Sequence, residues 1–162
     1  MTTTMLRTAN GLRTGSNASH DRWASDTMIT TKMNPEIKAM WIDALRSSEY
    51  EQGAGHLHTG YINGKEYFCC LGVLCDIAIK NGVVLDVEIQ SSDGGAVRWM
   101  YNGCTEYLPL AVAEWAGITT QGWFDLVLSP DGEKEIARQT LAELNDEGYS
   151  FGEIAEEIEA HF

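Results

Sequence analysis

The stretch EYFCCLGVLCDIAIKNG, residues 66–82, constrains the fold of this chain most, because a strand pattern runs directly into a helix pattern within it. From residue 70 onward, apolar side chains recur at helical spacing and leave few polar positions, which predicts a mostly buried helix. Lys80, Asn81 and Gly82 are typical of a helix end. Gly72 costs such a helix about 1 kcal/mol relative to alanine, so we expect it to mark close packing against a neighbour.

The same stretch holds three of the four cysteines, at positions 69, 70 and 75. Adjacent cysteines form a disulfide only with strain, so we expect free thiols and a reducing compartment. Helical spacing points Cys75 inward, where a free cysteine behaves as a small apolar residue. We therefore expect Cys70 and Cys75 to be buried and unligated, and Cys69 to be more accessible.

Asn63 and Gly64 lie between two strand patterns and predict a hairpin with a two-residue type I′ turn. Pairing Ile62 with Lys65 then places His58 opposite Cys69. The predicted core face of this hairpin holds Leu57, Tyr61, Phe68 and Cys70. The opposite face holds His56, His58, Ile62, Lys65, Tyr67 and Cys69.

The remaining patterns predict helices around a small sheet. Asn34 and Pro35 start an amphipathic helix over 35–48, and Pro109 and Gly117 bound a short one. Capping boxes at Thr140–Glu143 and Ser150–Glu153 start two C-terminal helices. Strand patterns cover 83–90, 96–101, 104–108 and 123–128, with turns at SSDGG, NG and SPDG. The fold class is α+β: a small antiparallel sheet built from hairpins, packed by an N-terminal helix, a central buried helix and two C-terminal helices.

The chain changes character at Met33. Residues 1–32 are rich in Thr, Ser, Asn and Gly without a hydrophobic period, so we expect a weakly ordered tail. Met28 or Met33 could be the biological start. Residues 33–162 are expected to form one globular domain.

The formal net charge is -13, and the excess of acidic residues is largest over residues 125–162. Such a field repels phosphate backbones, so nucleic-acid binding is disfavoured. No apolar run is long enough to span a membrane, and no secretory signal is evident. A basic surface on a partner protein fits the charge, and a homo-oligomer is a further option.

Two reactive sites are conceivable on the hairpin. His56, His58 and Cys69 could bind Zn²⁺ from one open face, although their spacing matches no standard zinc motif. A Cys69–His58 pair could be nucleophilic, although no motif marks an oxyanion hole. Nucleotide-binding loops, hydrolase signatures and dinucleotide fingerprints are absent from the sequence, so no cofactor is expected.

A ligand surface of aromatic and imidazole groups is the alternative to a reactive site. Such groups stack on bases and hydrogen-bond to phosphate or ribose, and a nucleotide would also need nearby basic side chains. The candidate ligand-binding residues are His56, His58, Lys65, Arg98, Trp99, Tyr101 and Trp123.

Four segments carry a family resemblance: MWIDALRSSEYEQG, FCCLGVLCDIAIKNG, LPLAVAEWAGI and LAELNDEGYSFGEIAEEIEAHF. Together they resemble a family of small tailed-phage and prophage proteins of unknown function. The resemblance implies an accessory phage protein in the host bacterial cytoplasm. We expect a non-catalytic binding protein that sequesters a host small molecule, such as a nucleotide signal, or inhibits a host protein in defence or regulation. The alternatives are a small metal- or thiol-dependent hydrolase and a virion-associated or assembly protein.

Overall fold

The computed structural model describes residues 32–128 and 135–162, and its fold is α+β. The predicted tail, residues 1–32, lies outside this part except for its last residue, and so does the predicted SPDG turn. The described helices are α2 (Pro35–Arg46), α3 (Cys70–Lys80), α4 (Leu110–Ala116), α5 (Leu141–Asp146) and α6 (Phe151–His161). The described strands are β1 (His58–Tyr61), β2 (Glu66–Phe68), β3 (Val87–Ser91), β4 (Ala96–Tyr101), β5 (Trp123–Leu128) and β6 (Glu135–Thr140).

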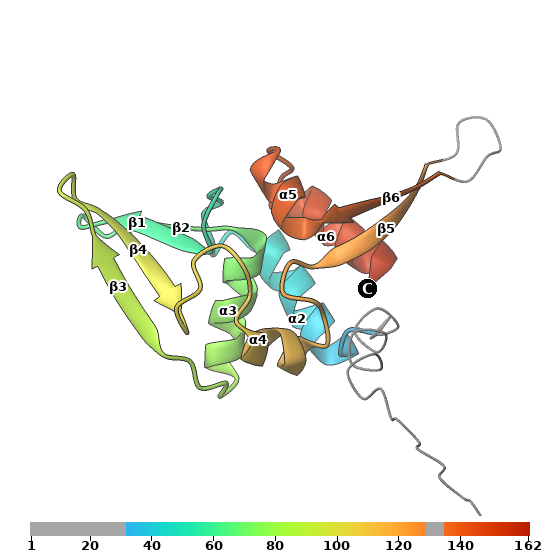
Figure 1. The fold of residues 1–162 in the computed structure, drawn as a ribbon, viewed down its shortest axis with the longest axis horizontal. Coiled ribbons are helices and arrows are strands. Elements are labelled where there is room, and N and C mark those ends of the chain that lie inside the picture. The colour runs from blue at the N-terminus through green and yellow to red at the C-terminus, as the bar shows by residue number, and fades with distance from the viewer. Residues whose placement is uncertain (1–31, 129–134) are drawn as a thin grey trace, which may run out of the picture. The chain divides into compact units, whose positions relative to one another are not determined.

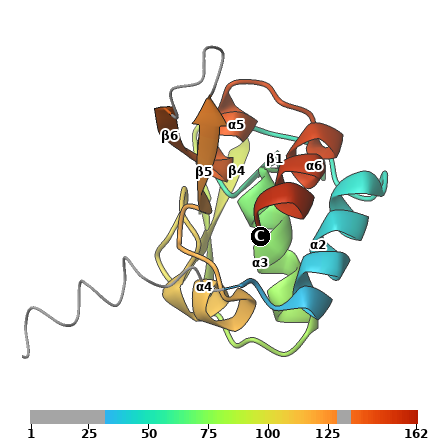
Figure 2. The same ribbon diagram turned by 90° about the vertical axis from the view of Figure 1, so that its right-hand side faces the viewer.

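The strands form a four-stranded antiparallel sheet in the order β2-β1-β4-β3 and a separate β5-β6 hairpin. Helix α3 is central, with the four-stranded sheet on one side and α2 on the other (Figures 1 and 2). Helix α2 also packs against α6, so the first and last described helices lie side by side. This arrangement confirms the predicted fold class.

Local sequence signals account for the helix boundaries. The Asn34 side chain accepts hydrogen bonds from the backbone N–H groups of Glu36 and Ile37 at the start of α2. Both predicted capping boxes are formed, at the starts of α5 and α6. Gly117, after α4, has a φ of 78°, the left-handed conformation that glycine adopts without strain.

The prediction of a type I′ turn was wrong, and the hairpin register is shifted by one residue. The backbone N–H of Gly64 donates to the carbonyl of Tyr61, and Gly64 has a positive φ whereas Asn63 does not. A type I′ turn needs positive φ at both positions, so this is a type I turn that ends in a bulged glycine. His58 therefore pairs with Phe68 rather than Cys69.

A shift of one residue moves side chains to the other face of a strand. His58, predicted on the open face, is only 5% exposed, and Tyr61, predicted in the core, is 49% exposed. The prediction that Cys69 is more accessible than Cys70 and Cys75 was also wrong, because all three are buried. All four cysteines are free.

Two strand predictions also need correction. Residues 104–108 form no strand; Cys104 makes only an isolated bridge to Tyr101. Strand β6 was not predicted, yet it pairs with β5 along its whole length. Within the part of the chain that the structure describes, no helix combines the length and apolar character needed to cross a membrane.

Candidate functional site

His58 lies inside an aromatic stack rather than on a ligand surface. Its ring is parallel to those of Phe68 and Trp99, with centroid distances of 3.9 and 3.8 Å. Its Nδ1 is 2.8 Å from the Tyr101 hydroxyl, and its Nε2 is 3.2 Å from a Glu66 carboxylate oxygen. Both ring nitrogens and both ring faces therefore have partners within the protein.

Burial lowers the pKa of the His58 imidazole below its usual value, although the nearby Glu66 carboxylate acts in the opposite direction. Burial also raises the pKa of the Tyr101 hydroxyl. Both groups are therefore held in their neutral forms near pH 7. A neutral, stacked histidine of this kind stabilises the interior of the sheet.

The other predicted ligand residues do not share one surface. Trp99 is half-buried against His58, whereas Arg98, its neighbour along β4, points to the opposite face of the sheet. Lys65 is exposed in the β1–β2 turn, and Trp123 belongs to the separate β5-β6 hairpin. Of the seven predicted residues, only His56 lines the pocket described next.

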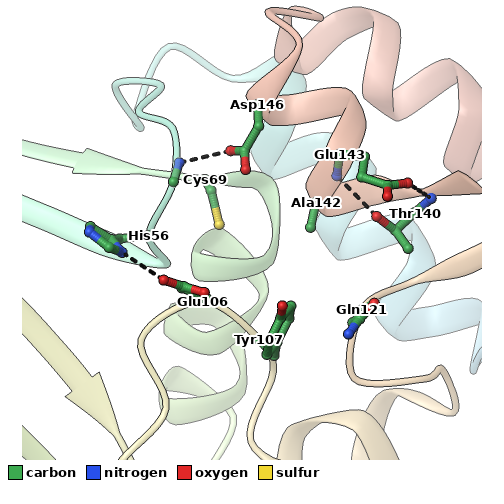
Figure 3. Close-up of a pocket in the computed structure, with 10 residues that line it drawn as sticks. His56, Cys69, Glu106, Tyr107, Gln121, Thr140, Ala142, Glu143 and Asp146 are labelled. Carbon is green, nitrogen blue, oxygen red and sulfur yellow. Dashed lines mark hydrogen bonds and ion pairs between the residues drawn. The ribbon is translucent and has the colours of Figure 1, made fainter.

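A polar pocket of about 140 Å³ lies at the N-terminal end of α3 (Figure 3). Its walls come from the segment before β1, the loops on either side of α4, and helix α5. The residues that line it are Gly55, His56, Cys69, Glu106, Tyr107, Gln121, Thr140, Ala142, Glu143 and Asp146.

Two carboxylates of the pocket are fixed by backbone donors. The Gly55 N–H donates to Asp146 Oδ1 at 2.8 Å, and the Thr140 N–H donates to Glu143 Oε2 at 3.0 Å. Within the described residues, the second oxygen of each carboxylate accepts no hydrogen bond. These oxygens are available to a ligand without rearrangement of the backbone.

His56 and Glu106 form a looser pair on the pocket wall. His56 Nδ1 is 3.8 Å from Glu106 Oε1, too far for a hydrogen bond. The Nδ1 atom is nevertheless buried, and no described residue hydrogen-bonds to it. A buried polar atom without a partner is costly, so a ligand or water that reached it would gain a hydrogen bond.

Cys69 lines the same pocket, but its environment disfavours nucleophilic chemistry. Its Sγ accepts a hydrogen bond from the Gly72 N–H at 3.4 Å, so it serves as the N-cap of α3. Burial raises the pKa of the Cys69 thiol to about 11, so the thiolate form is scarce at neutral pH. His58, which was considered as a possible base for Cys69, is engaged in the aromatic stack and does not line this pocket.

The three residues considered as possible zinc ligands, His56, His58 and Cys69, are not brought together by the structure. His58 and Cys69 are no longer paired across the hairpin, since His58 faces Phe68 instead. The residues that the structure describes contain no group of three or more His, Cys, Asp or Glu side chains positioned to hold a metal ion.

The segments that carry the family resemblance are joined by hydrogen bonds in the core, and four of their residues, Cys69, Ala142, Glu143 and Asp146, also line the pocket. The Trp41 indole donates to the Cys70 carbonyl at 2.9 Å, which ties α2 to α3. Buried Asn145 accepts from the Cys70 N–H through Oδ1 and donates to the Gly53 carbonyl through Nδ2. Gln52 donates to Asn145 and accepts from the Phe151 N–H at the start of α6. These hydrogen bonds connect the EQG, FCC, LND and SF segments of the resemblance.

Sequence reasoning missed most of the pocket. Glu106, Tyr107 and Gln121 come from loops without a motif, and Glu143 was assigned only a capping role. Asp146 is far from Gly55 in sequence, so no local pattern connects them. The hydrogen bond between them forms because the last residue of α5 lies beside the segment that precedes β1.

The fold and the pocket define a small α+β domain with a polar cavity. One of the buried cysteines, Cys69, and several carboxylates line this cavity. The chain belongs to the family described as a domain of unknown function (DUF8296), whose model matches residues 33–162. No curated protein and no solved structure matches the chain. The matched range coincides with the predicted globular domain. The family description does not include a phage origin.

Proposed function

We propose that this protein is a phage-encoded, non-catalytic binding protein that acts on a host defence or regulatory component. Its ligand is a cationic group, such as a lysine or arginine side chain of a host protein, which enters the pocket at the start of α3. The observation that carries this proposal is the pocket lining. It presents Glu106, Glu143 and Asp146, whereas none of the lysines and arginines in the described part of the chain belongs to it.

The size and charge of the pocket favour a protein side chain over a nucleotide. Sites for drug-sized ligands usually enclose about 300 Å³ or more. The present cavity, about 140 Å³, is large enough for the end of a long side chain or a small amine. Its carboxylates would repel phosphate groups, and the basic residues proposed for nucleotide binding, Lys65 and Arg98, do not line it.

Fixed carboxylates also favour binding without catalysis. The backbone bonds to Asp146 and Glu143 hold two acceptors in place before the ligand arrives, which lowers the entropy cost of association. The Cys69 thiol remains protonated at neutral pH, so it is a poor nucleophile.

The proposal is tested by calorimetric titration of the full chain. Acetyl-arginine-amide and acetyl-lysine-amide should bind at low ionic strength and more weakly at high salt, because the attraction is electrostatic. Acetyl-glutamine-amide and ADP should not bind. Binding of ADP, or equal binding of the neutral and charged amides, would overturn the proposed ligand class.

A matched pair of variants tests the pocket itself. Glu106→Gln removes one carboxylate of the lining with little change in shape, and Glu114→Gln makes the same charge change on the exposed side of α4. Because Glu106 is partly exposed, we expect a loss of only about two- to five-fold in affinity for the cationic amides. Glu114→Gln should bind as the unmodified protein does.

A thiol hydrolase is the second candidate, because Cys69, His56 and Glu106 line one cavity. If the protein is a thiol hydrolase, iodoacetamide should alkylate Cys69 rapidly, and the hydrolysis of an ester or amide substrate should depend on His56. Slow alkylation of Cys69, with no ester or amide hydrolysis above that of a Cys69→Ala variant, would exclude this alternative.

A further inference from the structure

The outer strand β3 leaves one edge of the four-stranded sheet open. The opposite edge is covered, because Phe68 of β2 exchanges backbone hydrogen bonds of 2.8 Å with Glu51 and Gly53. Beyond β3, Figure 1 shows no other element of the described chain. Natural edge strands are usually shielded by charged side chains, most often lysine, by proline or by a bulge, and Glu88 is the one charged side chain of β3. The β3 sequence, VEIQS, has neither lysine nor proline, and its pairing with β4 runs without a bulge.

The backbone groups at this open edge can be assigned. The Asn102 N–H donates to the Asp86 carbonyl at 2.7 Å, and the Ser92 N–H donates to the Ala96 carbonyl at 2.9 Å. Backbone bonds alternate along an antiparallel pair, so the even-numbered residues of β3 face β4. The N–H and C=O groups of Val87, Ile89 and Ser91 therefore point outward.

We propose that two copies of this chain associate through antiparallel pairing of their β3 strands, with a two-fold axis at Ile89. In this register Ile89 faces Ile89 of the second copy, and Val87 faces Ser91. All of these residues direct backbone groups toward the open edge, so the pairing extends both sheets into one continuous sheet. The pocket contains no residue of β3, so this association is independent of the proposed ligand site.

The charges of β3 favour this register with a second copy. Glu88 would face Gln90 of the second copy, so no acidic side chain faces another. A pairing centred at Glu88 would instead oppose two carboxylates, which is destabilising. Arg98 is paired with Gln90 in the sheet and forms no ion pair within the described residues. It would lie two strand spacings, about 10 Å, from Glu88 of the second copy, which two long side chains can span.

The other face of the strand supplies apolar contact. Val87 and Ile89, two aliphatic residues of the edge strand β3, are 41% and 61% exposed. Ile89 is paired with Trp99 on β4, so the two isoleucines at the axis would be flanked by a tryptophan from each copy. Such cross-strand apolar pairs stabilise sheets.

Sedimentation of the full chain from micromolar to millimolar concentration tests the association. We expect a monomer–dimer equilibrium. Ile89→Lys should weaken it by at least about ten-fold, because two like charges would meet at the axis. Ile62→Lys is the matched control, since Ile62 is 76% exposed in the β1–β2 turn, and it should leave the equilibrium unchanged. A monomer at every concentration, or a dimer insensitive to Ile89→Lys, would overturn the proposal.

Disulfide trapping tests the register. In a Cys104→Ser background, Ile89→Cys should give a covalent dimer on oxidation, because Cα atoms of a hydrogen-bonded antiparallel pair lie about 5.5 Å apart, within disulfide range. Ile62→Cys should stay monomeric under the same conditions. If Ile89→Cys formed no more covalent dimer than Ile62→Cys, the proposed pairing would be wrong. The same result is expected if another part of the chain covers the β3 edge, and that case would also overturn the proposal.

Discussion

Gly72, in the first turn of α3, packs its Cα directly against the carbonyl oxygen of Leu57, just before β1. A Cβ at position 72 would overlap this oxygen and the Leu57 carbonyl carbon. The contact explains why a glycine occupies a helix that is otherwise rich in residues with branched side chains. It fixes the distance between the start of the sheet and the central helix, and Cys69 beside it lines the pocket.

Replacement of Gly72 by alanine should therefore destabilise the fold strongly. The clash involves backbone atoms, which cannot move aside as a flexible side chain can, so we expect a loss of several kcal/mol or a failure to fold. Gly152→Ala is the matched control, because a Cβ there meets nothing closer than the Ser150 hydroxyl at 3.9 Å. It should be neutral or stabilising by up to about 1 kcal/mol in chemical denaturation. Equal stability of the two variants would contradict the packing described here.

Asn145 should be coupled energetically to Gln52. Asn145→Ala leaves the buried Cys70 N–H and the Gly53 carbonyl without their partner, so we expect a loss of about 2–4 kcal/mol in the free energy of unfolding. In a double-mutant cycle, Gln52→Ala should cost less in the Asn145→Ala background than alone. Glu114 is exposed on α4, so the effect of Glu114→Ala on the free energy of unfolding should simply add to that of Asn145→Ala. Additivity of Gln52 and Asn145 would argue against a shared network.

Thiol accessibility should separate Cys104 from the other three cysteines. Cys69, Cys70 and Cys75 are buried, and burial raises the pKa of each thiol. Cys104 is partly exposed. A disulfide reagent should therefore modify one thiol rapidly in the native protein, and Cys104→Ser should abolish this fast phase. A fast phase that persists in Cys104→Ser would show that the environment of α3 is more open than described.

The stability of the protein should decrease as His58 becomes protonated. Its pKa in the folded protein is below the ordinary value of 6.5, so the unfolded chain binds the proton more tightly. The contribution of neutral His58 to the free energy of unfolding is fully present above pH 6.5. It is lost as the pH falls through the pKa that His58 has in the folded protein. Glu66, the Tyr101 hydroxyl and Asp76 are the titratable groups that act on this ring.

His58→Phe keeps the aromatic stack and removes the proton-binding site. Between about pH 7.5 and about pH 5.5, the decrease in the free energy of unfolding should be smaller in this variant than in the unmodified protein, because only the latter can protonate a residue at position 58. His161→Phe, at the end of α6, controls for the loss of a histidine. The measurement is urea unfolding at each pH. An unchanged pH dependence in His58→Phe would contradict the assignment.

Signals that act over a few residues predicted much of this fold. The Asn34 cap, both capping boxes and Gly117 each define a helix end through contacts within one turn, and all four were confirmed. The buried face of α3 was also predicted, because helical spacing alone determines which of its side chains lie together.

The hairpin shows where such reasoning fails. An Asn-Gly pair fits either a type I′ turn or a type I turn with a bulged glycine, and the φ of Asn63 decides between them. That one angle sets the register, so it reversed the predicted environments of His58 and Tyr61. The pocket was less predictable still, because Glu106, Gln121 and Asp146 meet only through long-range packing.

The most direct test of the account is a two-dimensional NMR titration of the full chain with acetyl-arginine-amide. We predict shifts of the amide signals of residues at the pocket, such as His56, Tyr107 and Gln121. In Glu106→Gln the shifts should saturate at a higher ligand concentration than in the unmodified protein. In Glu114→Gln they should saturate at the same concentration as in the unmodified protein. The absence of any shift, or shifts confined to the sheet residues Trp99 and Arg98, would contradict the proposal that this pocket is the binding site.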